Sequence, residues 1–306
     1  MNHFDISHIV NGLKLAREDW RLAQHRLRET EGREFPSRIA LTAILEQLKG
    51  VLFPMRLGSP ELRRENEDYY VGYTLSKALN ALIDQACIEF SHHSLGAEQQ
   101  TCKVRQRAMD SIRTFSEMLP ELRRTLDMDV LAAYQGDPAA RNVDEVLLCY
   151  PGILAMIHHR IAHILYTLEL PVLARIIAES AHSQTGIDIH PGARISEAFF
   201  IDHGTGVVIG ETAIIGKRVR IYQAVTLGAK RFVKDEQGHL EKGQARHPIV
   251  QDDVVIYAGA TILGRVTLGQ GCIIGGNVWI TEDVRPGQIV TQASLLQENS
   301  KPGYPT

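Results

Sequence analysis

Aliphatic residues recur at every sixth position through the second half of the chain, a spacing that neither an isolated strand nor a helix produces. One row occupies residues 189–225, and a second, in a new register, occupies residues 254–284. Companion rows, in which many aliphatic residues precede a glycine, occupy 209–227 and 250–280. Such a repeat is typical of a parallel β-helix, in which each hexapeptide forms a short strand and a turn and three hexapeptides complete a coil. A sandwich or barrel would instead need alternation with a period of two residues.

The repeat is interrupted between Leu227 and Val250, which are separated by 23 positions where six would continue the pattern. About 17 residues, roughly 229–246, are therefore predicted to form an inserted loop. Its sequence is rich in charged residues, which indicates an exposed segment. Surface loops carried by a rigid scaffold are frequent sites of function.

The first 185 residues are predicted to be helical. Leu41, Leu45, Leu48 and Leu52 fall on one face of a helix, and Pro36 and Pro54 flank that helix. Further helical stretches are expected near 68–90, 98–127 and 143–180, with breaks at Gly96, at Pro120 and in the turn 136–138.

These patterns predict an α+β chain with two domains and a tail. An α-helical domain, residues 1–185, precedes a parallel β-helix, residues 186–290, that carries the inserted loop 229–246; residues 291–306 form a C-terminal tail. Because the end of a β-helix cannot bury itself, the helical domain is expected to cap the array.

Charge and cysteine content exclude several classes of protein. The net charge is −3, so the chain offers no general positive field to nucleic acid. No apolar run is long enough to cross a membrane, and the first residues lack the basic and apolar segments of a signal peptide, so we expect a cytoplasmic protein. The four cysteines form no CxxC pair, which argues against a zinc or disulfide framework.

Two histidines with charged neighbours stand out in the array. His203 follows Asp202 and takes a companion-row position where the repeat favours an aliphatic residue, and His247 follows Arg246 at the end of the inserted loop. Either histidine alone is compatible with a structural role, but polar residues that break a repeat tend to mark sites. Asp188 precedes His203 by fifteen positions, close to one coil, so the two are predicted to lie on adjacent coils.

This set of residues suits acyl transfer to a hydroxyl. A hydroxyl is a poor nucleophile near neutral pH, and a neutral imidazole can remove its proton as the new bond forms. A carboxylate on the other ring nitrogen would fix the tautomer of the imidazole and stabilise its charged form.

The most specific motifs are Asp-His-Gly-Thr-Gly at 202–206 and Arg-His-Pro at 246–248. Others are Gly-Asp-Pro at 136–138, Arg-Ile-Ala-His at 160–163, Asp-Ile-His-Pro at 188–191, Val-Ile-Gly-Glu-Thr-Ala at 208–213, Val-Thr-Leu-Gly at 225–228 and Tyr-Ala-Gly-Ala-Thr-Ile-Leu-Gly at 257–264. Together they resemble the serine O-acetyltransferases, a family of left-handed β-helix acyltransferases. The resemblance covers about residues 131–290 and implies transfer of acetyl from acetyl-CoA to L-serine, the first step of cysteine biosynthesis.

The resemblance also implies residue roles. His203 matches the general base, Asp188 its carboxylate partner, and His247 a second active-site histidine that contacts the substrate. Asp137 and Asp202 match carboxylates that hold the substrate ammonium, although an aspartate before Pro138 is also a good helix N-cap. Arg246 matches the residue that binds the substrate carboxylate, so the pocket would complement a zwitterion.

Small residues would line the coenzyme site. Gly228, Ala258 and Gly276 match positions along which the pantetheine arm of acetyl-CoA runs, or they serve only as coil corners. The loop 229–246 could close over the coenzyme. No metal is expected, and His158, His159 and His163 are interpreted as packing and surface residues because no third metal ligand is evident.

Partners are implied in the same way. The family forms trimers with active sites at subunit boundaries, and its helical domains join two trimers into a hexamer and supply part of the serine site. L-cysteine is expected to act as a feedback inhibitor. Family members insert a C-terminal isoleucine into O-acetylserine sulfhydrylase; the tail 300–306 ends in Thr306, so formation of that complex is in doubt.

Three alternatives remain open at this point. The first is a hexapeptide acyltransferase that uses another hydroxyl acceptor, such as homoserine or a sugar. The second is a γ-type carbonic anhydrase, which needs three converging histidines, two of them in a His-x4-His pattern that the array lacks. The third is a non-catalytic scaffold that binds partners through the β-helix.

Overall fold

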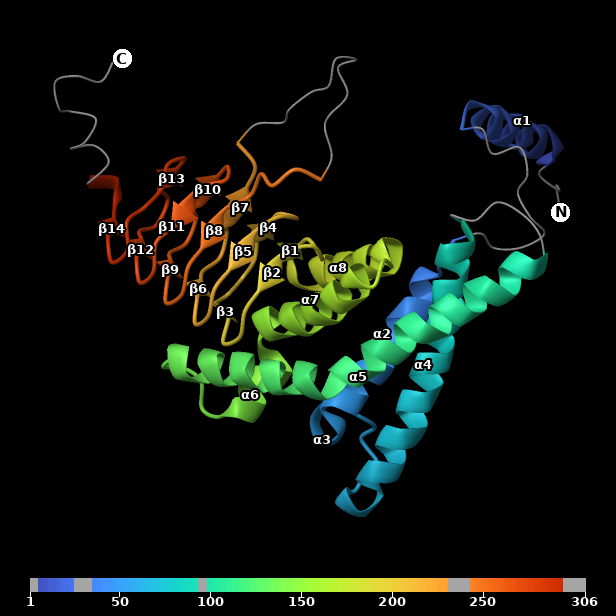
Figure 1. Cartoon of the computed structure of the whole chain (residues 1–306), viewed down its shortest axis with the longest axis horizontal. Coiled ribbons are helices and arrows are strands. Elements are labelled where there is room, and N and C mark those ends of the chain that lie inside the picture. The colour runs from blue at the N-terminus through green and yellow to red at the C-terminus, as the bar shows by residue number, and fades with distance from the viewer. Residues whose placement is uncertain (1–4, 25–34, 93–97, 231–242, 294–306) are drawn as a thin grey trace. The chain divides into compact units, whose positions relative to one another are not determined.

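The computed structural model describes residues 5–24, 35–92, 98–230 and 243–293 of the chain. Contacts divide the chain into two units, residues 1–35 and residues 36–306. The described part of the first unit contains one helix, α1 (Ser7–Ala23). The second unit holds the remaining helices and all the strands, so α2–α8 and the strands form one compact body (Figure 1). No helix of the described residues is long and apolar enough to span a membrane.

The helices of the second unit precede its strands in the sequence. They are α2 (Arg38–Leu52), α3 (Pro54–Leu57), the short 3₁₀ helix η1 (Arg64–Asn66), α4 (Glu67–His92), α5 (Glu98–Gly136), α6 (Val143–Cys149), α7 (Pro151–Thr167) and α8 (Pro171–Thr185). In α2 the four predicted leucines are buried, which confirms the predicted apolar face. Ser37 caps this helix by accepting a hydrogen bond from the backbone N–H of Ala40.

The break predicted at Pro120 is wrong, because α5 continues through this residue. Proline removes one backbone hydrogen bond and costs about 3 kcal/mol inside a helix. Buried Phe115, Leu119, Leu122 and Leu126 lie on both sides of Pro120 and pack against the helical core. Burial of such side chains contributes about 1.5–3 kcal/mol each, which outweighs the loss at the proline. The break predicted at Gly96 falls outside the described residues.

The strands build a left-handed parallel β-helix of hexapeptide repeats. They are β1 (Asp188–Ile189), β2 (Arg194–Ile195), β3 (Phe200–Ile201), β4 (Val208–Ile209), β5 (Ile214–Ile215), β6 (Arg220–Ile221), β7 (Thr226–Gly228), β8 (Ile249–Val250), β9 (Val255–Ile256), β10 (Thr261–Leu263), β11 (Thr267–Leu268), β12 (Ile273–Ile274), β13 (Trp279–Ile280) and β14 (Ile289–Val290). Every third strand pairs in parallel as far as β13, and β14 pairs in parallel with β12. The first sheet is β1-β4-β7-β10-β13, the second is β2-β5-β8-β11 and the third is β3-β6-β9-β12-β14.

The strand register measures the length of each coil. Val208 pairs with Thr226, eighteen positions later, as a coil of three hexapeptides requires. Ile214 pairs with Ile249, thirty-five positions later, so the predicted insertion of about 17 residues is confirmed. Residues 231–242 of the predicted loop 229–246 lie outside the described residues.

The first coil is longer than the repeat predicts. Asp188 pairs with Val208, twenty positions later, so two extra residues lie in the turn 202–206 between β3 and β4. The single six-residue row drawn through residues 189–225 is therefore wrong at this turn. Ile201 belongs to the row that continues through Ile209, whereas Val207 belongs to the other inward row.

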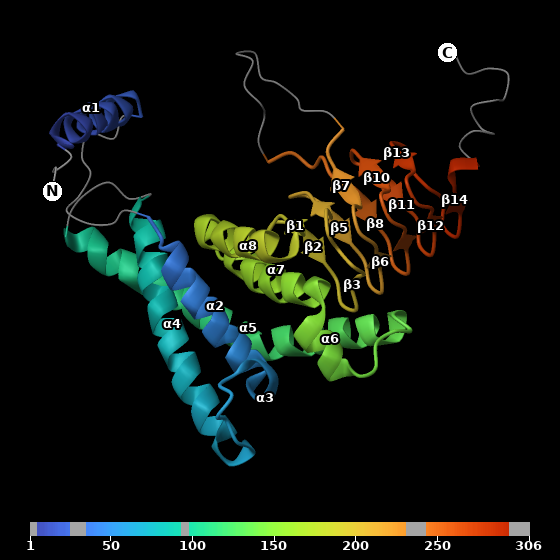
Figure 2. The ribbon, with the colours of Figure 1, turned by 180° about the vertical axis from the view of Figure 1, so that it is seen from behind.

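Helices α5, α7 and α8 cover the first coil, and the strands advance away from them (Figures 1 and 2). Ala155 and Met156 of α7 are part of the β-helix core, while Ile153 and Ile157 of the same helix belong to the helical core. Gly152 permits this approach, because a Cβ there would lie 2.3 Å from the carbonyl oxygen of Ile201.

A buried ion pair fastens the cap to the coil. Arg160 of α7 donates from Nε and Nη2 to the carboxylate of Asp129 in α5, at 2.6 and 2.9 Å. The same guanidinium also donates to the backbone oxygens of Ile195 and Ser196, and Asp129 accepts from the backbone N–H of Phe199. These bonds satisfy both charges where water is absent. Three segments far apart in the sequence are thereby held together directly before the turn that carries His203.

Candidate active site

The candidate residues lie on two different edges of the β-helix. We call the turns that follow β3, β6, β9 and β12 the His203 edge, which joins the third sheet to the first. We call the turns that follow β1, β4, β7 and β10 the His247 edge, which joins the first sheet to the second. Within one chain the two histidines therefore belong to separate groups of side chains.

His203 projects from the enlarged turn after β3. Its side chain is 71% exposed, and its own φ is 60°, followed by φ of 87° at Gly204. A Cβ on Gly204 would lie 2.4 Å from Cδ1 of Ile187, so glycine is required there for both backbone and space. The interpretation of His203 as the replacement of an inward aliphatic residue is wrong. Ile201 takes that inward position, and the two extra residues of the turn carry the imidazole outward.

Two aspartates lie beside His203. Asp202 Oδ1 is 3.8 Å from His203 Nε2, and its Oδ2 accepts a hydrogen bond of 2.7 Å from Arg220 of β6. Arg220 also donates to the backbone oxygen of Gly136, which connects this edge to the end of α5. A Cβ on Gly136 would lie 2.9 Å from the ring of Phe200, so this approach of α5 depends on glycine.

Asp137 follows directly after α5. Its Oδ2 accepts a hydrogen bond of 2.5 Å from the hydroxyl of Tyr150, and its Oδ1 accepts from the backbone N–H of Ala139. The hydrogen bond from Tyr150, followed by that from Ala139, lowers the pKa of Asp137, and the same contact raises the pKa of Tyr150 to about 12. Asp137 is not a helix N-cap, because α6 begins at Val143 and its N-cap is Asn142.

Asp188 begins the first coil and His203 lies in the turn that ends it, so the prediction that they lie on adjacent coils is wrong. The backbone N–H of Asp188 donates to Val207 O, close to the enlarged turn. Its carboxylate groups with Glu179 and His182 of α8, with ligand atoms within 4.8 Å of one another. In the described part of the chain these three residues are the group that could hold a metal ion. The structure thus groups Asp137, Asp202 and His203 near Arg220, whereas the carboxylate of Asp188 lies with Glu179 and His182 of α8.

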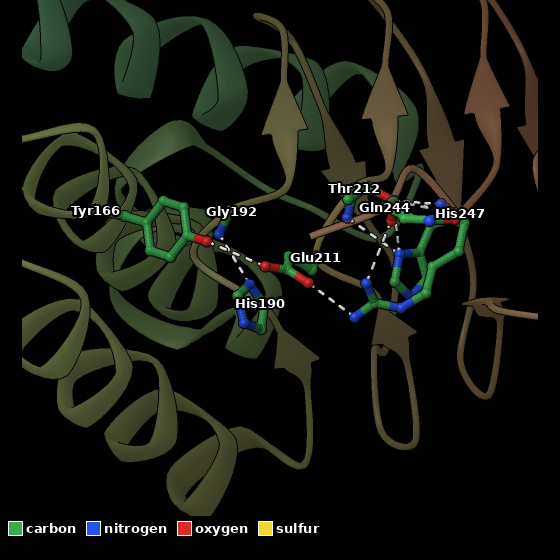
Figure 3. Close-up of polar contacts among 8 residues, drawn as sticks. Tyr166, His190, Gly192, Glu211, Thr212, Gln244 and His247 are labelled. Carbon is green, nitrogen blue, oxygen red and sulfur yellow. Dashed lines mark hydrogen bonds and ion pairs between the residues drawn. The ribbon is translucent and has the colours of Figure 1, made fainter. Parts of the chain in front are cut away.

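The His247 edge carries a second polar network (Figure 3). Arg246 Nη2 donates to Glu211 Oε2 at 2.7 Å, and Glu211 Oε1 accepts from the hydroxyl of Tyr166 in α7 at 3.1 Å. These contacts, the ion pair with Arg246 in particular, lower the pKa of Glu211 although its partial burial opposes this. Arg246 is thereby held against a carboxylate that stays charged at neutral pH.

His247 is buried beside Arg246. Its Nδ1 lies 3.1 Å from the backbone nitrogen of Thr212 and 2.9 Å from the hydroxyl of Thr212. Burial, reinforced by the charge of Arg246, lowers the pKa of His247 to about 4. The imidazole is therefore neutral near pH 7.

The small residues assigned to the coenzyme lie on both edges. Ala258 and Gly276 follow β9 and β12 on the His203 edge and are stacked on adjacent coils, where Ala258 O accepts from the N–H of Asn277. A Cβ on Gly276 would lie 3.2 Å from that same oxygen. Gly228 ends β7 on the His247 edge, at the start of the inserted loop.

Histidines of α7 are packed inside the protein. His158 and His159 are buried, and burial lowers the pKa of His158 to about 3. His163 Nδ1 lies 2.7 Å from the backbone oxygen of Pro191. These positions agree with the packing role expected for His158 and His159.

Sequence reasoning missed several residues that shape the two edges. Arg220 belongs to β6, Tyr166 belongs to α7, and Tyr150 links α6 to α7; the sequence cannot orient the outward face of these elements. Glu211 and Thr212 lie within a motif that carried the family resemblance, but nothing in their spacing indicated that they contact Arg246 and His247 across the inserted loop.

Comparisons with known proteins agree with this architecture. The family model described as bacterial transferase hexapeptide (six repeats) matches residues 247–282. Entamoeba histolytica serine acetyltransferase 1, solved in complex with L-cysteine, is 40% identical with a TM-score of 0.70 and covers 81% of this chain and 85% of its own. Soybean serine acetyltransferase complexed with serine is 30% identical with a TM-score of 0.52, covering 83% of this chain and 97% of its own.

A relative matches almost the whole chain. The plasmid serine acetyltransferase of Synechococcus elongatus is 54% identical over 298 residues, which cover 96% of this chain and 93% of that protein. Since the identity is high and extends over the helical region as well as the β-helix, this chain belongs to the serine acetyltransferase family.

Proposed function

We propose that this enzyme transfers the acetyl group of acetyl-CoA to the hydroxyl of L-serine, with His203 as the general base, and releases O-acetyl-L-serine and free coenzyme A. The observation that carries this assignment is that each edge offers a group of opposite charge to one end of a zwitterion. Asp137 and Asp202 lie on the edge of His203, where Arg220 holds Asp202. Arg246, held by Glu211, lies beside the neutral imidazole of His247 on the other edge. A pocket between two such edges complements the ammonium and carboxylate groups of a small amino acid.

In the reaction, His203 accepts the proton of the serine hydroxyl while the oxygen attacks the thioester carbonyl carbon. The carbon–sulfur bond then breaks, and the thiolate of coenzyme A takes up the proton from the imidazolium. Asp202, 3.8 Å from His203, and Asp188, which the family resemblance pairs with this base, are the carboxylates proposed to favour the charged imidazole. Exposure of His203 leaves the imidazole accessible to both substrates.

Substrate recognition divides between the edges. Asp137 and Asp202 bind the ammonium, and Tyr150 keeps Asp137 ionised and oriented. Arg246 and His247 bind the carboxylate. L-cysteine has the same two charged groups and a thiol in place of the hydroxyl, so we propose that it competes for this pocket as a feedback inhibitor.

The coenzyme is proposed to lie along the His203 edge. Ala258 and Gly276, stacked beyond the coil of His203, leave the backbone open to close approach by the pantetheine arm. Gly228 marks the start of the loop 229–246, which we propose closes over the coenzyme. The reaction requires no metal ion.

Because the two edges of one chain lie apart, we propose that the enzyme is a homotrimer. Around a threefold axis, the His203 edge of one copy faces the His247 edge of the next, and each boundary completes one site. The helical region is proposed to join two trimers into a hexamer.

The direct test is release of free thiol from acetyl-CoA with L-serine, with L-homoserine and without acceptor, for the wild type and His203→Ala. We expect serine-dependent release that falls about 10²–10⁴-fold in the variant, the usual contribution of a general base. Thiol release with L-homoserine but not with L-serine would support the assigned acetyl transfer and identify a different acceptor. No release with either acceptor from folded, oligomeric protein would contradict the assignment.

A further inference from the structure

The turn after β4 contacts both residues assigned to the substrate carboxylate. It consists of Gly210, Glu211 and Thr212, three consecutive residues between β4 and β5. Arg246 and His247 reach this turn from the far end of the inserted loop, about one coil above it in the array. Each of the three residues makes a different contact with the pair.

Thr212 determines which ring nitrogen of His247 carries the proton. The backbone N–H of Thr212 donates to Nδ1 of His247 at 3.1 Å. A backbone amide nitrogen can only donate, so Nδ1 must be the unprotonated nitrogen. In the neutral ring the proton therefore resides on Nε2, which becomes a hydrogen-bond donor.

The hydroxyl of Thr212 also orders the backbone before β8. Its Oγ1 accepts hydrogen bonds from the backbone N–H groups of Arg246 at 2.9 Å and His247 at 3.1 Å. One side chain thus fixes the end of the inserted loop at the two residues that matter for binding. Figure 3 shows Thr212 beside His247, with dashed lines for the contacts between them.

Gly210 provides the space in which the imidazole lies. A Cβ on this residue would be 2.0 Å from Cδ2 and 2.1 Å from Nε2 of His247. The φ of Gly210 is outside the left-handed region, so alanine would suit the backbone and collide only with the ring. Glycine is therefore needed here for the position of the imidazole.

Glu211 holds the guanidinium beside that ring. Its ion pair with Arg246 is 2.7 Å long, and the hydroxyl of Tyr166 orients the other carboxylate oxygen. Since Tyr166 belongs to α7, the helical region contributes to the orientation of Arg246.

From these contacts we infer that the Gly210-Glu211-Thr212 turn is a positioning element that fixes His247 as an Nε2–H donor to the substrate carboxylate. His247 is then a binding residue, and His203 is the single base of the reaction. This inference rests on the proposed function for the identity of the ligand, but the tautomer and the contacts of His247 are independent of it.

The tautomer can be measured without activity. In protein labelled with ¹⁵N in its histidines, the His247 signals, assigned with His247→Gln, should show an unprotonated Nδ1 and a protonated Nε2 at pH 7. A protonated Nδ1 or a charged ring would overturn the inference, even if the enzyme acetylates serine as proposed.

Two replacements of His247 test its role in the reaction. The amide nitrogen of glutamine can reach the place of Nε2, whereas the amide of asparagine reaches only the place of Nδ1. We expect His247→Gln to retain kcat/KM for L-serine within about tenfold, and His247→Asn to lose about tenfold more, chiefly through KM. Equal losses, or an acid limb of the kcat/KM pH profile that disappears in His247→Gln, would show that His247 is not such a donor.

Gly210→Ala tests the space for the ring. A displacement of about 1 Å can cost about 100-fold, so kcat/KM for L-serine should fall by about that factor. KM for acetyl-CoA should change little. Gly72→Ala in α4 is the matched control, because a Cβ there meets no atom within 4 Å. A Gly210→Ala enzyme that behaves like this control would contradict the positioning role.

Thr212→Val and Thr212→Ser separate the hydroxyl from the methyl group. Valine keeps the backbone donor to Nδ1 but loses the two hydrogen bonds that order residues 246 and 247. We expect the serine enzyme to resemble the wild type and the valine enzyme to show a KM for L-serine raised about tenfold. Equal behaviour of the two variants would count against the role of the hydroxyl.

Discussion

At the scale of single residues, the orientation of the charged candidate residues depends on the side chains that hydrogen-bond them. Tyr150 illustrates this on the His203 edge. Its hydroxyl donates to Asp137 and is the largest cause of the lowered pKa of that carboxyl. The same residue precedes Pro151 at the start of α7, so the orientation of Asp137 is tied to a helix that caps the coil.

Tyr150→Phe should therefore weaken serine binding without removing the base. The ring and its packing remain, but Asp137 loses the donor that fixes its rotamer. We expect KM for L-serine to rise about tenfold while kcat changes little, as for the loss of one hydrogen bond to a charged group. Steady-state kinetics with varied serine would measure this.

Tyr73→Phe provides the comparison for this prediction. Tyr73 lies in α4 with an exposed side chain, so its variant should match the wild type. A fall in kcat with unchanged KM in Tyr150→Phe would instead show that the hydroxyl acts on the chemical step.

At the scale of elements, the sequence predicts the repeat and the size of its insertion but conceals the enlarged turn. Each coil has two inward aliphatic rows, and both repeat with a period of six. The two extra residues at 202–206 shift the six-residue period from one inward row to the other. Val207 therefore follows Ile201 by six positions and is aliphatic, although the two residues belong to different rows. Only the strand pairing reveals that the turn carrying His203 is enlarged.

The partners of the candidate residues could not be predicted for a related reason. Periodicity identifies which residues point inward, but the outward contacts of Arg220 or Glu211 depend on which edge meets which helix. The family resemblance implied roles for His203 and His247, which stay predictions, while the separation of these residues onto two edges required the coordinates.

Helix α7 carries a pH-dependent contribution to stability. Neither ring nitrogen of His158 has a hydrogen-bond partner among the described residues, and burial lowers its pKa from the usual 6.5 to about 3. Between these values the unfolded chain takes up a proton that the folded chain does not. Stability is therefore complete above pH 6.5 and falls on acidification, by about 1.4 kcal/mol per pH unit for such a group.

His158→Leu should reduce this dependence. The free energy of unfolding, measured with urea at pH 7.5, 6.5 and 5.5, should decline less steeply in the variant than in the wild type. His182→Leu is a suitable comparison, since His182 is exposed at the end of α8. Identical slopes for His158→Leu and the wild type would contradict the assignment of this proton uptake to His158.

At the scale of the whole molecule, the separation of the two edges supports the proposal that more than one copy of the chain builds each site. The first sheet lies between the two edges. It therefore separates the turn that carries His203 from the connection that carries His247. In a trimer related by threefold symmetry, the missing half of every site is supplied by a neighbour. The helices that cap the first coil then hold both edges in register, through Arg220 on one and Tyr166 on the other.

Mixed oligomers test this arrangement. His203→Ala should be nearly inactive alone, and His247→Ala should lose most of its kcat/KM for L-serine. The two chains are co-expressed with different tags, and the hybrid oligomers are isolated. These oligomers contain boundaries at which one copy supplies intact His203 and the next copy supplies intact His247. Each mixed trimer contains one such boundary among its three, so about a third of the wild-type kcat/KM for L-serine is expected from isolated mixed trimers. Chains that carry both substitutions, mixed in the same way with His203→Ala, provide no intact boundary and should stay inactive. If the hybrids of the single variants were equally inactive, both histidines would have to act within one chain, and the separation of the two edges would lose its functional meaning.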